Sequence, residues 1–514
     1  MFPHRAGSKC LALLLMVYYS IAQNTLLKGG TIISFEEGEN SLQVIRKGSL
    51  LVTQDRITGI YRAGEGPDSS LNYSTVDVTG RIITPGFIDT HRHGWQTGLK
   101  TLGSNTSLWE YYDRYSEYAA GSSYATEDVY IGQIAGLFEA LNAGVTTTLD
   151  HAHHTWSNDT SKAGIQASID SGARVFWSYA FHDLPDFTVS EQFANFRDIA
   201  QAGTFKNTAT TLGIACDFFG PDPTLENVQR VVELALEFNV SVVTTHTVEG
   251  PFGARNGPLE VHRAGLLNTT IPVVFSHASF LTYQDHQLLQ LTNQYISITP
   301  ESEMHYGHTH PNNHLAMDQA ALGVDTHFTF SSDILTQARM WLQKVRYTMY
   351  DWALKAWRVP SNNPMSANQA FLLATRKGGL ALRRPDLGVI SEGAKADIIV
   401  WDGTSPSLLG WNDPVAAIML HANVGDIEHV LVDGKFVKKD GKITNPDYAN
   451  TRERFLKHVK RIQDTFLAIP KPVPAKGEHF RGGGAELMAI PQLDVTRGDG
   501  NGYGTDFLQF SGTQ

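Results

Sequence analysis

The chain has 514 residues, of which 42% are hydrophobic and 18% are charged. This is the composition of a globular protein long enough for a large core and a smaller attached domain. Its 41 basic and 52 acidic residues give a formal net charge of −11, without a long basic run. We therefore expect no nucleic-acid partner.

The N-terminus predicts a cleaved secretory signal. A basic start at residues 4–9 precedes a mostly apolar stretch at 11–22, in which Ser20 and Ala22 are the small residues that a signal peptidase reads. The apolar stretch is too short to span a membrane, and the alternatives are an amphipathic helix or a membrane anchor. We expect residues 1–22 to be removed and the mature protein to be secreted or held in the secretory pathway, with no membrane contact.

Two further features depend on secretion. Asn-x-Ser/Thr triplets, which are candidate glycan sites in a secreted chain, begin at Asn72, Asn105, Asn158, Asn239 and Asn268. Cys10 would leave with the signal, so Cys216 would be the only cysteine and no intrachain disulfide could form. Stability must then come from the core and any bound metal.

Short segments rich in β-branched and aromatic residues alternate with helical stretches along most of the chain. The eight predicted strands are 82–89, 145–150, 173–179, 210–216, 241–246, 271–277, 295–299 and 326–331. Helices predicted between them include 128–141, 225–238 and 283–292. Eight β/α repeats over about 250 residues predict a (β/α)8 barrel.

The two ends of the chain have a different sequence pattern, without the alternation of strands and helices. Short strands interrupted by Gly and Asp are predicted at 26–34, 49–60, 74–79, 388–401 and 427–436. We expect residues 23–81 and 384–465 to form one small β-domain beside a barrel at 82–383. After Pro470, further prolines and the run Gly482-Gly483-Gly484 predict an irregular tail, within a C-terminal segment at 466–514.

Polar residues that suit a metal follow four of the predicted strands. His91 and His93 stand at i and i+2 at the end of the first strand, where both side chains point to the same side. His246 ends the fifth strand and Asp333 follows the eighth, while His277 ends the sixth. In this type of barrel the carboxyl ends of the strands form one mouth, so we expect these side chains to converge. Three histidines and an aspartate suit zinc or iron with an open position for water.

Each of these residues has a structural alternative when it is taken alone. A single histidine can be an ordinary polar residue at a strand end. Asp333 can be the N-cap of the helix predicted over 334–357. Only the joint pattern predicts a metal site.

Several longer motifs accompany this pattern. They are ITPGFIDTHRH on the first strand, AGVTTTLD on the second, THTVE on the fifth, SHAS on the sixth, FSSD on the eighth, and EGAKADIIVWD with VLVDGKFVKKDGKI near the C-terminus. With these motifs the chain resembles the amidohydrolase superfamily, in the branch of metal-dependent aminohydrolases and chlorohydrolases that act on nitrogen heterocycles. The resemblance covers nearly everything after the signal segment. It implies a distorted (β/α)8 barrel with a small β-sandwich built from both ends of the chain.

The resemblance also implies the site residues. His91, His93, His246 and Asp333 should hold one divalent metal, zinc or alternatively iron. Glu249, three residues after His246, and His277 should carry protons, and Asp333 could share that role. The alternative for Glu249 is a surface position on a helix.

Two local differences from the family pattern matter here. Two-metal members carry a carboxylated lysine at the end of strand four, whereas this chain has Ala215-Cys216-Asp217, which implies a single metal. A buried structural role is the more frequent one for a cysteine such as Cys216. Many relatives place Gly or Thr before the strand-eight aspartate and Gly after it, but Ser332 and Ile334 flank Asp333. The shape of the mouth there should therefore differ.

Loops near the mouth supply candidate substrate contacts. Trp95 and Gln96 follow the first strand, His154 follows the second, and Glu303 and His305 follow the seventh. The alternative is that the His-rich loops are surface features or bind an adventitious metal.

These residues predict an enzyme that hydrolyses non-peptide C–N bonds of a small molecule. A metal-activated water would attack an sp² carbon, Asp333 or His277 would take its proton, and Glu249 would protonate the ring nitrogen and the leaving group. The leading interpretation is deamination of an aminated heterocycle. The alternatives are hydrolysis of an amide or lactam of a specialised metabolite, or a catalytically silent binding protein. A homo-oligomer is expected only by analogy with the family.

Overall fold

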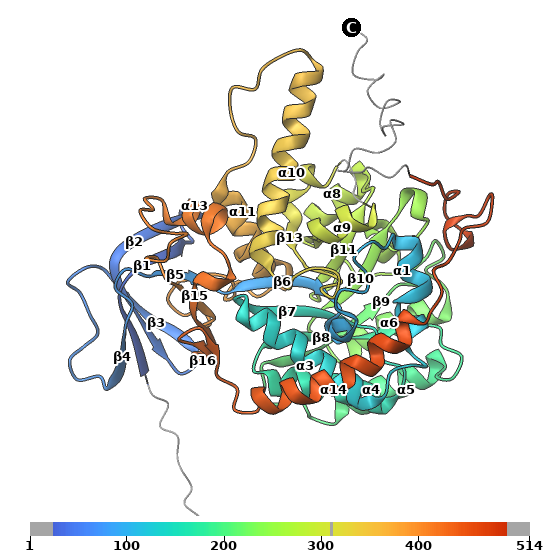
Figure 1. Ribbon diagram of the computed structural model, residues 1–514, viewed down its shortest axis with the longest axis horizontal. Coiled ribbons are helices and arrows are strands. Elements are labelled where there is room, and N and C mark those ends of the chain that lie inside the picture. The colour runs from blue at the N-terminus through green and yellow to red at the C-terminus, as the bar shows by residue number, and fades with distance from the viewer. Residues whose placement is uncertain (1–23, 309–311, 491–514) are drawn as a thin grey trace, which may run out of the picture.

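The computed structural model describes residues 24–308 and 312–490 (Figure 1). The predicted signal at 1–22 and the last residues of the predicted tail lie outside this range.

The centre of the molecule is a sheet of eight parallel strands that curves into a nearly closed barrel. Its strands are β6 (Phe87–Arg92), β7 (Val145–Ala152), β8 (Arg174–Phe181), β9 (Thr210–Cys216), β10 (Val243–Val248), β11 (Val273–Ser279), β12 (Tyr295–Ile298) and β13 (Ala320–Leu322). The seam between the first and last strands is held by the His91 carbonyl, which accepts from the backbone N–H groups of Val324 and Asp325 at 3.0 and 2.8 Å. The (β/α)8 fold class is confirmed.

A second sheet lies beside the barrel and contains segments from both ends of the chain (Figure 1). Its strands are β1 (Asn24–Glu36), β2 (Ser41–Thr53), β3 (Arg56–Tyr61), β4 (Tyr73–Asp77), β5 (Ile82–Pro85), β14 (Ile398–Trp401), β15 (Ile427–Val432), β16 (Lys435–Lys439) and β17 (Lys442–Ile443). The two ends of the chain meet where β5 pairs with β14 in antiparallel register. As predicted, both ends of the chain therefore contribute to one small β-domain, which is consistent with the expected β-sandwich.

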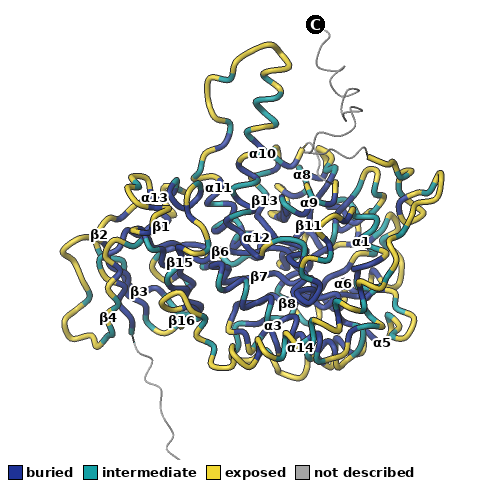
Figure 2. The backbone as a smooth tube through the Cα atoms, in the orientation of Figure 1, coloured by how far each residue is buried: buried dark blue, intermediate teal, exposed yellow. Residues whose placement is uncertain are grey.

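The helices cover the outside of the barrel and its mouth. They are α1 (Leu108–Arg114), α2 (Glu117–Ala120), α3 (Thr126–Asn142), α4 (Asn158–Ser171), α5 (Val189–Gln201), α6 (Glu226–Glu237), α7 (Pro258–Arg263), α8 (Tyr283–Thr292), α9 (Pro300–Tyr306), α10 (Ile334–Lys355), α11 (Ala367–Ala374), α12 (Arg376–Ala381), α13 (Pro414–Ala416) and α14 (Tyr448–Leu467). The barrel strands are buried, whereas the far end of α10 and the loop after it project from the body and are exposed (Figure 2).

Two predicted strands are placed differently in the structure. The first, 82–89, is divided at Gly86, so that β5 belongs to the second sheet and only β6 enters the barrel. The eighth prediction, 326–331, is wrong, because the last barrel strand is β13 (Ala320–Leu322). The segment Thr326-His327-Phe328-Thr329 has strong β propensity, but pairing of Ala320 with Ile296 on β12 fixes the strand earlier in the chain.

An ion-pair network joins the barrel to the second sheet. The Arg174 guanidinium, at the start of β8, donates to both carboxylate oxygens of Asp397 at 2.9 and 3.0 Å and to Asp433 at 2.5 Å. Arg174 and Asp397 are both buried. A bidentate arginine pair of this kind restricts the relative position of the two sheets.

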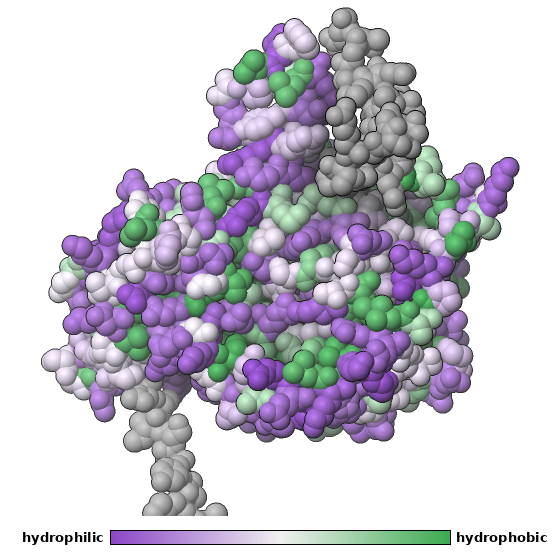
Figure 3. Space-filling view, viewed as in Figure 1, coloured by the Kyte–Doolittle hydropathy of each residue, from purple (hydrophilic) through white to green (hydrophobic). Residues whose placement is uncertain are grey.

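The outer face seen in Figure 3 is mostly hydrophilic, with separate apolar patches. Within residues 24–308 and 312–490, none of the helices has the length and apolar character that a membrane span requires.

Candidate metal and active site

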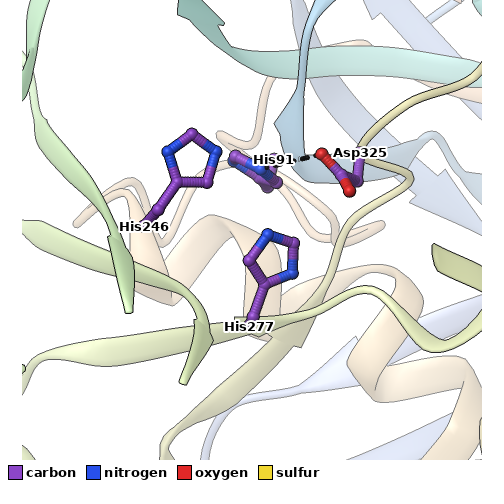
Figure 4. Close-up of side chains that lie close together, drawn as sticks. All are labelled: His91, His246, His277 and Asp325. Atoms are coloured by element: carbon purple, nitrogen blue, oxygen red, sulfur yellow. Dashed lines mark ion pairs between the residues drawn. The ribbon is translucent and has the colours of Figure 1, made fainter. Parts of the chain in front are cut away.

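Four side chains from different strand ends bring potential metal-binding atoms together at the barrel mouth. Atoms of His91, His246, His277 and Asp325 all lie within 4.8 Å of one another (Figure 4). His93 adjoins them, since its Nε2 lies 3.1 Å from Asp325 Oδ1 and 3.2 Å from His246 Nε2. The structure therefore brings together all four predicted histidines.

The second nitrogen of each imidazole is occupied by another partner. His91 Nδ1 lies 2.8 Å from Ser276 Oγ, and His277 Nδ1 lies 2.8 Å from Thr299 Oγ1. His93 Nδ1 faces the His151 carbonyl at 3.0 Å, and that of His246 faces Asp217 Oδ2 at 2.7 Å. Because a carbonyl and a carboxylate only accept, Nδ1 carries the proton in these two rings and Nε2 is free to bind a metal.

The residue between the two first-strand histidines points away from them. Arg92 is fully buried, with Nη1 3.7 Å from Asp89 Oδ2 and Nη2 donating to the Gly136 carbonyl. This alternation is the ordinary side-chain pattern of a strand, and it explains how a charged residue fits inside H-R-H.

The carboxylate of the site comes from Asp325, three residues after β13 ends. Asp325 Oδ1 lies 3.2 Å from His91 Nε2, and Ser302 Oγ donates to Asp325 Oδ2 at 2.5 Å. Burial alone would raise the pKa of Asp325, but the neighbouring His91 and His93 hold it well below its usual range. Asp325 is therefore an anion ready to bind a cation.

The backbone around Asp325 is shaped for close approach. Asp325 has a positive φ of 68°, which aspartate tolerates better than most residues. A Cβ at Gly323 would lie 2.7 Å from Ser297 Oγ and 2.9 Å from the backbone nitrogen of His91. Only glycine therefore lets the end of β13 lie against the end of β6, which puts the carboxylate beside His91.

Asp333, the aspartate assigned from the sequence, does not belong to this group. It caps α10: its Oδ1 accepts from the Leu335 N–H at 2.9 Å, and its Oδ2 accepts from Thr336 Oγ1 at 2.7 Å. The assignment followed from the misplaced eighth strand. Ser332 and Ile334 depart from the family pattern, which was a sign of this error. The short apolar run before Asp325 was the signal that could have placed the last strand correctly.

Glu249 lies just beyond β10, outside the set of residues that line the cavity over the histidines. Its Oε1 is 2.3 Å from the position of a Cβ built on Gly257. Burial raises the pKa of Glu249 to about 7, with Asp285 and Glu260 adding to the effect. Such a pKa suits proton transfer, but the side chain lies against Gly257 and does not line the cavity.

The five predicted substrate contacts also lie outside the lining of the cavity. Trp95 and Gln96 lie behind it, where Trp95 Nε1 donates to His153 Nδ1 at 2.9 Å and Gln96 Nε2 donates to the Tyr111 hydroxyl at 3.0 Å. In these positions they support the lining residues His153 and Tyr111.

The other three are fixed elsewhere. His154 is buried against Trp177, and His305 Nε2 faces the Gly103 carbonyl at 3.0 Å. Glu303 is buried behind His277, where its Oε1 accepts from the Thr299 N–H at 2.9 Å. These side chains pack against or bond to other parts of the protein, which their sequence positions did not reveal.

The cavity above the imidazoles has a volume of about 350 Å³, a size that suits a small ligand. Aromatic rings dominate its walls, namely those of Tyr111, Tyr112, Tyr118, Phe252, Tyr306 and Phe480. Charged groups at the walls are Glu117, Asp217 and Arg481, besides Asp325 at the floor. Among the residues that line the cavity, His93, His246 and His277 were the ones predicted from the sequence as site residues.

Asp217, at the end of β9, orients His246. Its Oδ1 accepts from the His246 backbone N–H at 2.7 Å and from Thr245 Oγ1 at 3.2 Å, while its Oδ2 contacts the imidazole. The same Oδ2 lies 3.5 Å from His151 Nε2. Asp217 stands at the strand-four position discussed for lysine, and the adjacent Cys216 is buried.

We expect Asp217→Asn to weaken metal binding by about 10- to 100-fold, the usual effect of removing a carboxylate that orients a metal-binding histidine. Competition of the purified protein with a zinc chelator measures this change. The matched control is Asp222→Asn, an aspartate on a nearby loop whose carboxylate accepts hydrogen bonds from Thr224. Equal zinc affinity in both variants would contradict the orienting role.

The donor set fits a divalent transition metal. Imidazole nitrogens with one carboxylate oxygen suit zinc or iron, and they leave a position open for water. His91 Nε2 is buried and faces Asp325 Oδ1, without a hydrogen bond to any other described residue, which suits a metal-binding atom.

Comparison with known proteins agrees with this architecture. Residues 82–437 match the amidohydrolase family. A 5-methylthioadenosine/S-adenosylhomocysteine deaminase of Thermococcus kodakarensis is 27% identical over 430 residues, covering 80% of this chain and 93% of the relative. A 5'-deoxyadenosine deaminase of Methanobrevibacter smithii is 25% identical, covering 81% and 94%.

Among solved structures, the chain resembles an adenosine deaminase from Xanthomonas campestris with bound zinc. The TM-score is 0.72 at 18% identity, covering 86% of this chain and 99% of the other. This likeness supports the fold. With the matched family range spanning the whole barrel and reaching into the second sheet, the chain belongs to the amidohydrolase family.

Proposed function

We propose that the protein is a zinc-dependent hydrolase that removes the amino group from an aminated heterocycle as ammonia. The observation that carries this proposal is the convergence of the imidazoles and Asp325 at the floor of an aromatic-walled cavity. Planar rings stack well between aromatic side chains. The deaminase activities of the relatives name purine nucleosides as the first substrates to test.

In this proposal His91, His93, His246 and Asp325 hold the ion. When bound, zinc supplies Lewis acidity that makes water an effective nucleophile near neutral pH. The remaining chemistry needs a proton to move from the water to the leaving amino group.

His277 is placed for this proton transfer. Burial holds the pKa of His277 well below its usual range, so its imidazole is neutral. Its place beside His91, His246 and Asp325 puts it within reach of a water bound at the site. Thr299 fixes the ring through Nδ1, and Glu303 in turn holds Thr299. We assign the transfer to His277 because Glu249 does not line the cavity.

The test uses zinc-loaded protein with adenosine, 5'-methylthioadenosine, 5'-deoxyadenosine and guanine, and a second set of amides and lactams. We expect ammonia from at least one purine, with no new carboxylate. Carboxylate from the second set alone would support the alternative, amide or lactam hydrolysis. No hydrolysis in either set would overturn the enzyme proposal.

Secretion is a further proposal, carried by the N-terminal sequence. The five sequon asparagines, Asn72, Asn105, Asn158, Asn239 and Asn268, are all exposed in the fold. Expression in a eukaryotic secretory host, followed by mass measurement before and after enzymatic deglycosylation, tests it. Retention in the cell with an intact N-terminus would contradict the proposal.

A further inference from the structure

The segment after α14, residues 470–490, returns to the mouth of the barrel; we name it the C-terminal strap. It is drawn in dark red beside α1 in Figure 1. It lies outside residues 82–437, which match the family. Its composition predicted an irregular tail, yet it contributes Phe480, Arg481, Gly483 and Gly484 to the cavity wall.

The strap has a defined internal structure. Phe480 N–H donates to the Ala485 carbonyl at 3.0 Å, and Gly484 N–H donates to the Phe480 carbonyl at 2.8 Å. Leu487 N–H donates to the Glu478 carbonyl at 2.8 Å, beside an antiparallel bridge between His479 and Glu486. These bonds make a compact loop whose tip carries Phe480 and Arg481.

The glycine run lets this loop lie directly on the barrel. Ala485 N–H donates to the Pro251 carbonyl, just after β10, at 2.6 Å. A Cβ at Gly484 would lie 2.7 Å from the Pro251 carbonyl oxygen, and one at Gly253 would lie 3.0 Å from the Gly483 carbonyl oxygen. The two backbones can approach this closely only because neither glycine has a side chain.

The two tip side chains are held by aromatic rings of the cavity wall. The Phe480 ring is buried, and its centre lies 5.3 Å from the ring centre of Phe252 and 5.7 Å from that of Tyr112, in edge-to-face geometry. The Cζ atom of the Arg481 guanidinium lies 4.4 Å from the ring centre of Tyr112 and 5.6 Å from that of Tyr118. Arg481 has a positive φ of 47°, a conformation that non-glycine residues adopt mainly where surrounding contacts enforce it.

The charge of the wall indicates what Arg481 does. It is the only lysine or arginine among the described residues that line the cavity, whereas Glu117, Asp217 and Asp325 are acidic. A guanidinium stacked on tyrosine faces has several N–H donors, so Arg481 can bind a further acceptor besides the Tyr112 hydroxyl. An oxygen on the ligand is such an acceptor.

We propose that the C-terminal strap closes the substrate cavity and selects the substituent carried by the heterocycle. Phe480 packs against the substituent, and Arg481 donates hydrogen bonds to an oxygen on it. Both are specificity-determining residues. This role rests on the proposed deaminase function for its substrate class, but closure of the cavity by the strap can be measured without turnover.

The experiment compares Phe480→Ala and Arg481→Asn with Met488→Ala, a control in the same strap whose side chain is 78% exposed. Asparagine is chosen because it tolerates positive φ. Metal content and thermal unfolding establish that each variant is folded and loaded. The first readout is the rate at which 1,10-phenanthroline, a planar aromatic chelator, removes zinc.

We expect faster zinc removal from Phe480→Ala than from the wild type and Met488→Ala. The second readout is kcat/KM for adenosine relative to adenine, which lacks the ribosyl substituent. Loss of a charged hydrogen bond in Arg481→Asn should lower this ratio by about tenfold through a higher KM for adenosine, whereas Met488→Ala should leave the ratio unchanged.

Wild-type rates of zinc removal in Phe480→Ala would overturn closure by the strap, whatever the enzyme does. An unchanged adenosine-to-adenine ratio in Arg481→Asn would overturn its role in selection. If the intact protein acts on neither purine, the proposed substrate class and the selection role fail together, and zinc removal alone decides closure.

Discussion

Replacing Asp325 by alanine should remove the bound metal, whereas replacing Asp333 by alanine should not. Asp325 lies among the site imidazoles, while the Asp333 carboxylate caps α10. Removing a residue that only hydrogen-bonds to a metal ligand lowers metal affinity by about 10- to 100-fold. Removing the ligand Asp325 itself should therefore lower the affinity by more than ~100-fold and reduce activity to background. Asp333→Ala should retain metal and lose about 1 kcal/mol of stability, the usual value of an N-cap.

Metal content by mass spectrometry and unfolding by denaturant measure the two effects. The pair tests the structural assignment against the one made from sequence, because each aspartate is the control for the other. Zinc retained in Asp325→Ala and lost in Asp333→Ala would reverse the assignment.

Replacing His277 by asparagine should lower kcat by about 10²- to 10⁴-fold while the metal stays bound, as expected for loss of a proton carrier. Asparagine suits the positive φ of 67° at this position, so the backbone need not move. The control is His286→Asn, a histidine of α8 that pairs with Asp318 away from the mouth.

Metal content and kcat must be measured on the same preparation. Simultaneous loss of metal would make His277 a ligand, in keeping with its place in the cluster. Unaltered kcat would exclude His277 from proton transfer.

The periodicity of the sequence predicted most of the barrel. Strands such as β9 agree with their predicted bounds, since continuous runs of β-branched and apolar residues suit a strand buried on both faces. His91 and His93 were also predictable, because spacing by two on a strand fixes the side to which side chains point.

The carboxylate of the site, Asp325, was not predictable from the local sequence pattern. β13 has only three residues, and its position depends on pairing with β12 and on the seam with β6. Local β propensity favoured a strand at 326–331 instead, and the aspartate that follows this segment is Asp333, so Asp333 was predicted as the ligand in place of Asp325. Register across a sheet is a long-range property that a local pattern does not contain.

By itself, the sequence determined the fold class, the family resemblance and the histidines at the strand ends. Only the tertiary structure decided which carboxylate joins them, that Asp217 contacts His246, and that residues of the C-terminal strap line the cavity. The physical reason is the range of the interactions. A histidine pair is defined by neighbours on one strand, whereas the wall of the cavity forms where segments hundreds of residues apart, such as Tyr112 and Phe480, come into contact.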